Sequence, residues 1–188
     1  MQVTGHGIPD PVVDGLASAI DAFFGLELDH KQRYAAPRPS INRGYTAPRS
    51  ERLSYSLGVV TPDDLFEAFN VGAAVSDVPG VECDPEIYAA NIWPDELPEF
   101  RRAVSTWFRH AGFVARRMTN VFALALGLPP DHFAPFTDHS IDVLRLNNYA
   151  VPADDQLLAD QLGMGAHTDY GIVTVLWADP VPGLEIIR

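Results

Sequence analysis

Apolar residues recur at helical spacing in two stretches of the chain. In residues 9–28, Asp10 and Pro11 suit the first turn of a helix, and one face of that helix carries Val13, Leu16, Ile20, Phe23 and Phe24. In residues 98–126, apolar residues recur at steps of three and four until Gly127 and Pro129 interrupt the pattern. Both stretches are therefore predicted to be helices with a buried apolar face.

The pattern changes from helical to alternating after residue 138. Strands are predicted at residues 141–149, 165–169, 171–178 and 184–187, with Gly, Pro and Asp between them. Earlier in the chain we expect a polar loop at residues 34–54 and a short helix start at residues 61–64, where aspartates follow Thr61. Helices come first and strands last, so the predicted fold class is α+β, with a helical region at residues 1–138 packed on a sheet or barrel that residues 139–188 begin.

Composition narrows the classes of function. The chain has 188 residues, 47% of them hydrophobic, which fits one globular domain. Its net charge of −12 disfavours nucleic acid and anionic membranes as partners, and no apolar stretch is long enough to span a bilayer. The single cysteine, Cys83, excludes an internal disulfide, and the start of the chain lacks the pattern of a signal peptide. We therefore expect a cytoplasmic protein.

His167 and Asp169 are the candidate metal ligands. In a strand, residues two apart point to the same side, so this imidazole and this carboxylate would project together. They would supply two corners of the facial triad of two histidines and one carboxylate that holds Fe(II). A His-x-Asp pattern alone is also compatible with a surface turn.

The predicted strand at residues 141–149 has a polar face. Arg145, Asn147 and Tyr149 alternate along it and therefore point to one side. A polar trio inside a barrel is costly unless it binds something, whereas on an edge strand it would simply face solvent. Arg43 and Tyr45, in the predicted loop, could close over a substrate, although a loop arginine is usually only solvated.

Several phrases, in order along the chain, resemble the isopenicillin N synthase-like branch of the iron(II)/2-oxoglutarate oxygenases. They are VTGHGIPDPVVDGLASAIDAFFGLELDHKQRY, NIWPDELPEFR, VLRLNNYAVP and GMGAHTDYGIVTVLWADPVPGLEI. The resemblance implies a distorted jelly-roll (double-stranded β-helix) core with Fe(II) held by His167 and Asp169. It also implies that Asn147 and Tyr149 bind the co-substrate 2-oxoglutarate. Dioxygen and a small-molecule substrate are the expected partners, and ascorbate is a candidate further cofactor.

The resemblance further implies a distal iron histidine and an Arg-x-Ser pair downstream of His-x-Asp. Neither occurs before Arg188, so we expect a truncated jelly roll that is inactive as given, from a parent dioxygenase that releases succinate and carbon dioxide. One alternative is an oxidase of the same fold that uses no 2-oxoglutarate, and another is a non-catalytic remnant. The resemblance implies that the small-molecule substrate is hydroxylated, desaturated or cyclised.

Overall fold

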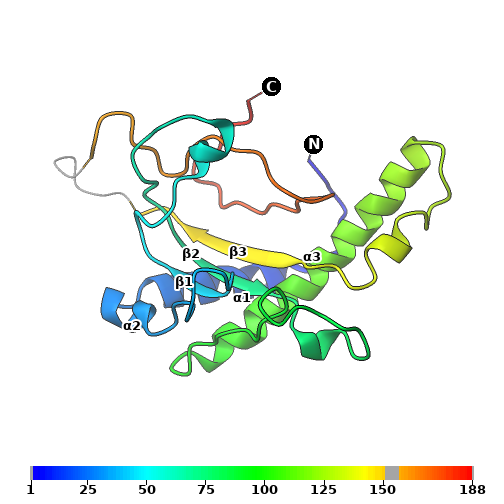
Figure 1. Ribbon diagram of the computed structural model, residues 1–188, viewed down its shortest axis with the longest axis horizontal. Helices are drawn as coiled ribbons and strands as arrows, with labels where there is room; N and C mark the ends of the chain where they lie inside the picture. Colours follow the sequence, from blue (N-terminus) through cyan, green and yellow to red (C-terminus); the bar gives the residue numbers. More distant parts are fainter. Residues whose placement is uncertain (1, 151–156, 188) are drawn as a thin grey trace.

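The computed structural model describes residues 2–150 and 157–187, and its centre is a three-stranded antiparallel sheet. The strands are β1 (Gly44–Thr46), β2 (Glu67–Gly72) and β3 (Val143–Asn148), in the order β1-β2-β3. Two helices, α1 (Asp10–Phe24) and α3 (Pro98–Ala125), lie together along one face of this sheet (Figure 1). The described residues therefore form a helical layer on a small antiparallel sheet, which is the predicted α+β class.

Aromatic side chains join the two helices to the sheet. The ring of Phe23 on α1 lies 4.7 Å from that of Phe69 on β2 and 5.2 Å from that of Phe100 on α3, centre to centre. Phe69 and Phe100 are themselves 5.0 Å apart, and all three are almost completely buried. The pairs Phe23–Phe69 and Phe69–Phe100 meet edge to face, and such pairs stabilise a core beyond their buried area.

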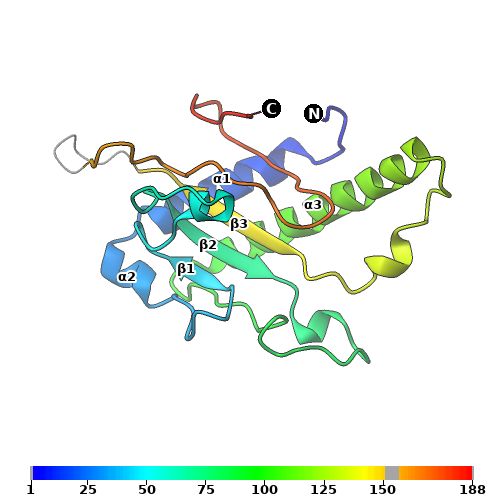
Figure 2. The same ribbon diagram turned by 45° about the horizontal axis from the view of Figure 1, so that its top comes forward.

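Both long helices occur where the apolar spacing predicts them. The first ends at Phe24 rather than at residue 28, and a separate short helix, α2 (Leu28–Gln32), follows it. The second matches its predicted range closely, but only part of its apolar face is buried. Val104 and Trp107 lie in the core, whereas Val121 and Phe122 are exposed, because the end of α3 extends past the sheet (Figure 2).

The two faces of the sheet differ in chemistry. Tyr45, Phe69 and Leu146 point into the core between sheet and helices. Side chains alternate along a strand, so Arg145 and Asn147 of β3 occupy the opposite face, together with Asn70, which pairs with Arg145 in the register. Residues 157–187 cross this polar side as irregular chain (Figure 1).

Several sequence predictions of local structure are wrong. Residues 165–169, 171–178 and 184–187 form no strands: in the described part of the chain their backbone builds no ladder of hydrogen bonds with another strand, although β3 is an edge strand of the sheet. The irregular segment still contacts the rest of the fold. The amides of Leu65 and Phe66 donate to the carbonyl of Gly163 at 3.1 and 3.0 Å, and the ring of Trp177 lies 6.1 Å from that of Trp107 on α3. Residues 61–64 are not helical either, since the backbone of Asp64 pairs with another segment: its amide donates to the carbonyl of Glu51 at 2.9 Å and its carbonyl accepts from the amide of Arg49 at 3.0 Å.

The remaining elements are short 3-10 helices: η1 (Leu53–Leu57), η2 (Val75–Asp77) and η3 (Ala134–Phe136). Sequence analysis missed both β1 and β2, which lie within the region predicted to be helical. The single sheet thus draws strands from both sides of the expected boundary at residue 138, and that boundary stays a prediction. No helix in the part of the chain that the structure describes is long and apolar enough to cross a membrane.

Candidate metal centre and co-substrate site

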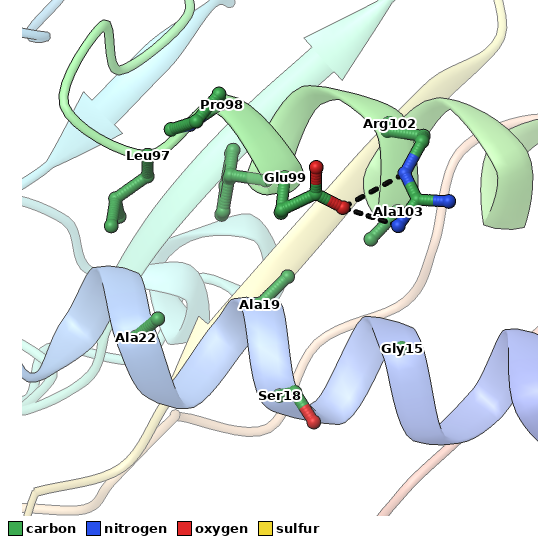
Figure 3. Close-up of a pocket in the computed structure, with 10 residues that line it drawn as sticks. Gly15, Ser18, Ala19, Ala22, Leu97, Pro98, Glu99, Arg102 and Ala103 are labelled. Carbon is green, nitrogen blue, oxygen red and sulfur yellow. Dashed lines mark hydrogen bonds and ion pairs between the residues drawn. The ribbon is translucent and has the colours of Figure 1, made fainter.

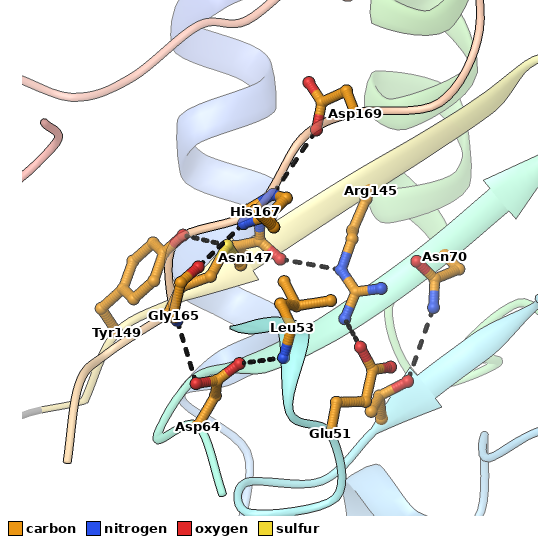
Figure 4. A network of polar contacts seen from close by, with 12 residues as sticks. Glu51, Leu53, Asp64, Asn70, Arg145, Asn147, Tyr149, Gly165, His167 and Asp169 are labelled. Atoms are coloured by element: carbon orange, nitrogen blue, oxygen red, sulfur yellow. Dashed lines mark hydrogen bonds and ion pairs between the residues drawn. The ribbon is translucent and has the colours of Figure 1, made fainter. Parts of the chain in front are cut away.

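The side chains of His167 and Asp169 converge, although not on a strand. Nε2 of His167 lies 3.5 Å from Oδ1 of Asp169, and the two side chains are 28% and 53% exposed. Nδ1 of His167 lies 2.9 Å from the carbonyl oxygen of Gly165, as Figure 4 shows. The expected convergence is therefore present, but irregular backbone produces it rather than strand alternation.

The hydrogen bond at Nδ1 of His167 determines whether the other ring nitrogen, Nε2, carries a proton or a free lone pair. A carbonyl oxygen only accepts, so Nδ1 of His167 carries the proton, and Nε2 of the neutral ring has a free lone pair. That lone pair faces the Asp169 carboxylate, so two acceptors lie side by side. A cation between its members, either a proton or a metal ion, would satisfy both acceptors at once. Neighbouring ligands about 2.1 Å from one metal would be about 3 Å apart, so the donor set fits a metal.

A buried carboxylate anchors the segment that carries His167. Asp64 is 2% exposed, and its Oδ1 and Oδ2 accept the amides of Gly165 at 2.9 Å and Leu53 at 2.8 Å. A side chain at Gly165 would lie 3.0 Å from Cβ of Ser54, so the two segments are in close contact. Sequence analysis missed this role, because the sequence predicts Asp64 to be an acid in the first turn of a short helix and its partner Gly165 is 101 residues away.

Arg145, Asn147 and Tyr149 share one face, as predicted. Nε of Arg145 donates to Oδ1 of Asn147 at 3.1 Å, and both the Arg145 guanidinium and the Tyr149 ring contact Phe66. The Tyr149 hydroxyl lies 3.6 Å from Sδ of Met164, so this residue lies against the segment that leads to His167. The polar face of β3 and the candidate ligands thus lie on the same side of the sheet (Figure 4).

Burial raises the pKa of the Tyr149 hydroxyl above its usual value of 10.0. The Arg145 charge lowers this pKa and the Asp64 charge raises it, and the net direction is upward. Tyr149 is therefore a protonated donor at neutral pH. Such a hydroxyl suits an anionic ligand, because it can donate without adding negative charge.

Neither Arg43 nor Tyr45 has the role that the sequence suggested. Arg43 is 3% exposed and donates to the carbonyls of Asn42, Ala73, Ile87 and Ala89, so it is neither solvated nor open to a substrate. Burial lowers the pKa of the Arg43 guanidinium below its ordinary value. Tyr45 is also buried and donates to Glu67 on the helical side of the sheet, so both residues hold the fold together.

No third metal-binding side chain joins His167 and Asp169 within residues 2–150 and 157–187. A surface groove of about 370 Å³ lies between α1 and α3, on the opposite side of the sheet (Figure 3). Small side chains such as Ala19 and Ala22 line it, and the Glu99–Arg102 ion pair lies beside it. It contains none of the candidate site residues.

The chain is similar in sequence to known non-haem dioxygenases. The family described as "non-haem dioxygenase in morphine synthesis N-terminal" matches residues 1–96. Proline hydroxylase buaE of Petromyces alliaceus is 33% identical over 98% of this chain, and validamycin A dioxygenase of Streptomyces hygroscopicus subsp. limoneus is 32% identical over 98%. The chain therefore belongs to the non-haem iron(II)/2-oxoglutarate dioxygenase family, as its resemblance to the isopenicillin N synthase-like branch implied.

Solved structures agree with this assignment. A 2OG-Fe(II) oxygenase family protein from Caulobacter crescentus is 26% identical, with a TM-score of 0.62 over 75% of this chain and 44% of that one. A full-length Neurospora crassa protein solved in complex with alpha-KG has the same fold, with a TM-score of 0.69 over 88% of this chain and 50% of its own. The chain also spans only 56% and 50% of the proline hydroxylase and the validamycin dioxygenase, about half the length of the curated relatives it matches.

Proposed function

We propose that this chain is part of an iron(II)- and 2-oxoglutarate-dependent dioxygenase that oxidises a small molecule. The observation that carries the proposal is the convergence of His167 Nε2 and Asp169 Oδ1 at 3.5 Å. Relatives named as dioxygenases across nearly the whole chain support it. The same proposal includes a jelly-roll core for the fold. It also includes dioxygen as the second reactant and ascorbate as a candidate further cofactor.

His167 and Asp169 would hold the metal, with the Gly165 carbonyl keeping the imidazole in the tautomer that frees Nε2. Bound iron(II) and 2-oxoglutarate supply the oxidation of a substrate C–H bond by dioxygen, with release of succinate and carbon dioxide. Asn147 and Tyr149 would donate hydrogen bonds to 2-oxoglutarate. This arrangement orients an anion close to the metal ligands and needs no proton transfer by the protein.

Metal binding tests the proposal without depending on turnover. Anaerobic titration of the chain with Fe(II) and 2-oxoglutarate should show one site, and Asp169→Asn should weaken Fe(II) binding at least about tenfold, since a charged ligand is lost. Asp179→Asn is a matched control, because Asp179 is exposed and its side chain accepts the amide of the nearby Val181. Equal Fe(II) affinity for the wild type and Asp169→Asn would rule out this metal centre.

The same titration tests the co-substrate. 2-Oxoglutarate that binds only in the presence of metal, and less tightly after Tyr149→Phe, supports the dioxygenase. Metal binding without any effect of 2-oxoglutarate would instead favour an oxidase of the same fold. A chain that binds neither would be a non-catalytic relative.

A further inference from the structure

We propose that Arg145, held by Glu51, is a positioning residue that orients the Asn147 side-chain amide so that its NH2 group faces the co-substrate. The inference rests on the proposed function, because it assigns a direction to the Asn147 contact with 2-oxoglutarate. Three contacts around one guanidinium carry it.

The Arg145 guanidinium is held from several sides. Its Nη2 donates to Oε2 of Glu51 at 2.7 Å, and its Nε donates to Oδ1 of Asn147 at 3.1 Å. Its central carbon lies 4.9 Å from the centre of the Phe66 ring, and Phe66 is 1% exposed. Glu51 precedes η1 and is 94 residues from Arg145, so the group is fixed between two distant parts of the chain (Figure 4).

An asparagine amide can present either its oxygen or its nitrogen to a ligand, and the two orientations have similar shape. A guanidinium has only donors, so the Arg145 contact selects the orientation in which Oδ1 of Asn147 faces Arg145. The NH2 group is then directed to other acceptors. 2-Oxoglutarate carries two carboxylates and a ketone, all acceptors, so this orientation favours it, whereas a rotated amide would place oxygen against oxygen.

Arg145 could also favour an anion simply through its charge, and two substitutions separate these effects. Gln carries its amide nitrogen at the same place along the side chain as Nε of arginine, so Arg145→Gln keeps a donor for Asn147 but removes the charge. Lys has a carbon at that place, so Arg145→Lys keeps the charge near Glu51 but removes the donor. Arg145→Met removes both.

The first readout needs no ligand. In ¹⁵N-labelled protein, the Asn147 side-chain NH2 signals should be similar in the wild type and Arg145→Gln, and should shift and exchange faster in Arg145→Lys and Arg145→Met. Thermal unfolding of each variant shows whether it is folded. Unchanged Asn147 signals in folded Arg145→Lys would overturn the positioning role.

The second readout is titration with 2-oxoglutarate in the presence of Zn(II), a diamagnetic substitute for iron. We expect Arg145→Lys to weaken 2-oxoglutarate binding about tenfold, the equivalent of one hydrogen bond, and Arg145→Gln to change it less. Glu51→Gln, which frees the guanidinium, should fall between the wild type and Arg145→Lys. If Arg145→Lys bound 2-oxoglutarate tightly and Arg145→Gln bound it weakly, the charge of Arg145 alone would explain its effect, and the proposal would be overturned. If the wild type bound no 2-oxoglutarate, the proposed function would fail. The NMR signals of Asn147 need no ligand, so they would still show whether Arg145 orients the Asn147 amide.

Discussion

Gly165 lies at the closest contact between the segment that carries His167 and η1. A Cβ added there would lie 3.0 Å from Cβ of Ser54, 3.1 Å from its amide nitrogen and 3.2 Å from Oδ1 of Asp64. The backbone and the buried carboxylate cannot move freely, so the added methyl group must push the segment outward. Packing at this glycine therefore determines where the candidate metal ligands lie.

We expect Gly165→Ala to lower the free energy of unfolding by about 1–3 kcal/mol, as overpacking usually does, and to weaken Fe(II) binding as His167 shifts. Denaturant unfolding and metal titration measure the two effects. Gly15→Ala is the matched control, because its Cβ would meet nothing within 4 Å, and alanine in the α1 helix should stabilise by about 0.5–1 kcal/mol. Equal metal affinity for Gly165→Ala and the wild type would contradict the anchoring role.

The Tyr45 hydroxyl links stability to alkaline pH. Its burial, its hydrogen bond to Glu67 and the charge of that carboxylate all raise its pKa above 10.0 in the folded protein. A raised pKa means that the folded state keeps the proton more tightly than the unfolded state. The stabilisation is thus complete below about pH 10 and is lost as the pH rises further.

We expect the free energy of unfolding to fall above about pH 10, with Tyr45 contributing up to about 1.4 kcal/mol per pH unit. Denaturant unfolding between pH 8 and pH 11 measures this slope. Tyr45→Phe should be less stable at pH 8 but should show a shallower alkaline slope. The slope should not vanish, since burial also raises the pKa of Tyr149. An identical slope in Tyr45→Phe would show that other groups cause it.

At the scale of elements, α2 is tied to the sheet by a buried ion pair. Nζ of Lys31 donates to the carbonyl of Phe24 at 3.0 Å and lies 2.8 Å from Oε2 of Glu67 on β2. Glu67 also accepts from Tyr45 and, at 2.9 Å, from Asn148 on β3. This carboxylate therefore joins one helix and all three strands, and its charge has Lys31 as counterion.

Lys31→Met should lower the free energy of unfolding by about 3–5 kcal/mol, because it leaves Glu67 charged and buried without its counterion. Arg38→Met is the matched control: its ion pair with Glu86 is 2.8 Å long but exposed, so we expect a loss of about 1 kcal/mol or less. Adding Glu67→Gln to Lys31→Met should recover part of the loss. No recovery would mean that packing of the lysine chain, and not charge, causes the effect.

The long helices were predictable because their apolar spacing records which face is buried. The strands of the sheet were less predictable from the sequence. Strand β2 is buried on both faces and does not alternate, and β1 has only three residues, so neither carries a pattern. Residues 171–178 are mostly β-branched or aromatic yet form no strand, since a strand also needs a partner. In the candidate site, local spacing identified His167 and Asp169, whereas Asp64 and Glu51 act through contacts 101 and 94 residues away.

At the scale of the whole molecule, the candidate site is open. Asp169 is half exposed, and the neighbouring Tyr170 is 91% exposed. The helical side of the sheet buries a dense aromatic core, whereas on the polar side the irregular segment 157–187 leaves large apolar residues such as Ile186 and Ile187 in solvent. The described residues thus build a well-packed support for the candidate metal ligands without enclosing them.

This openness leads to a prediction for turnover by the 188-residue polypeptide. Two protein ligands hold a metal weakly, because water fills its remaining positions, and a facial triad needs a third side chain that no group among the described residues provides. We therefore expect the polypeptide, supplied with Fe(II), ascorbate and 2-oxoglutarate, to form little or no succinate above a His167→Gln control. Succinate formation by the 188-residue polypeptide, lost in His167→Gln, would contradict this and would mean that another group completes the iron site.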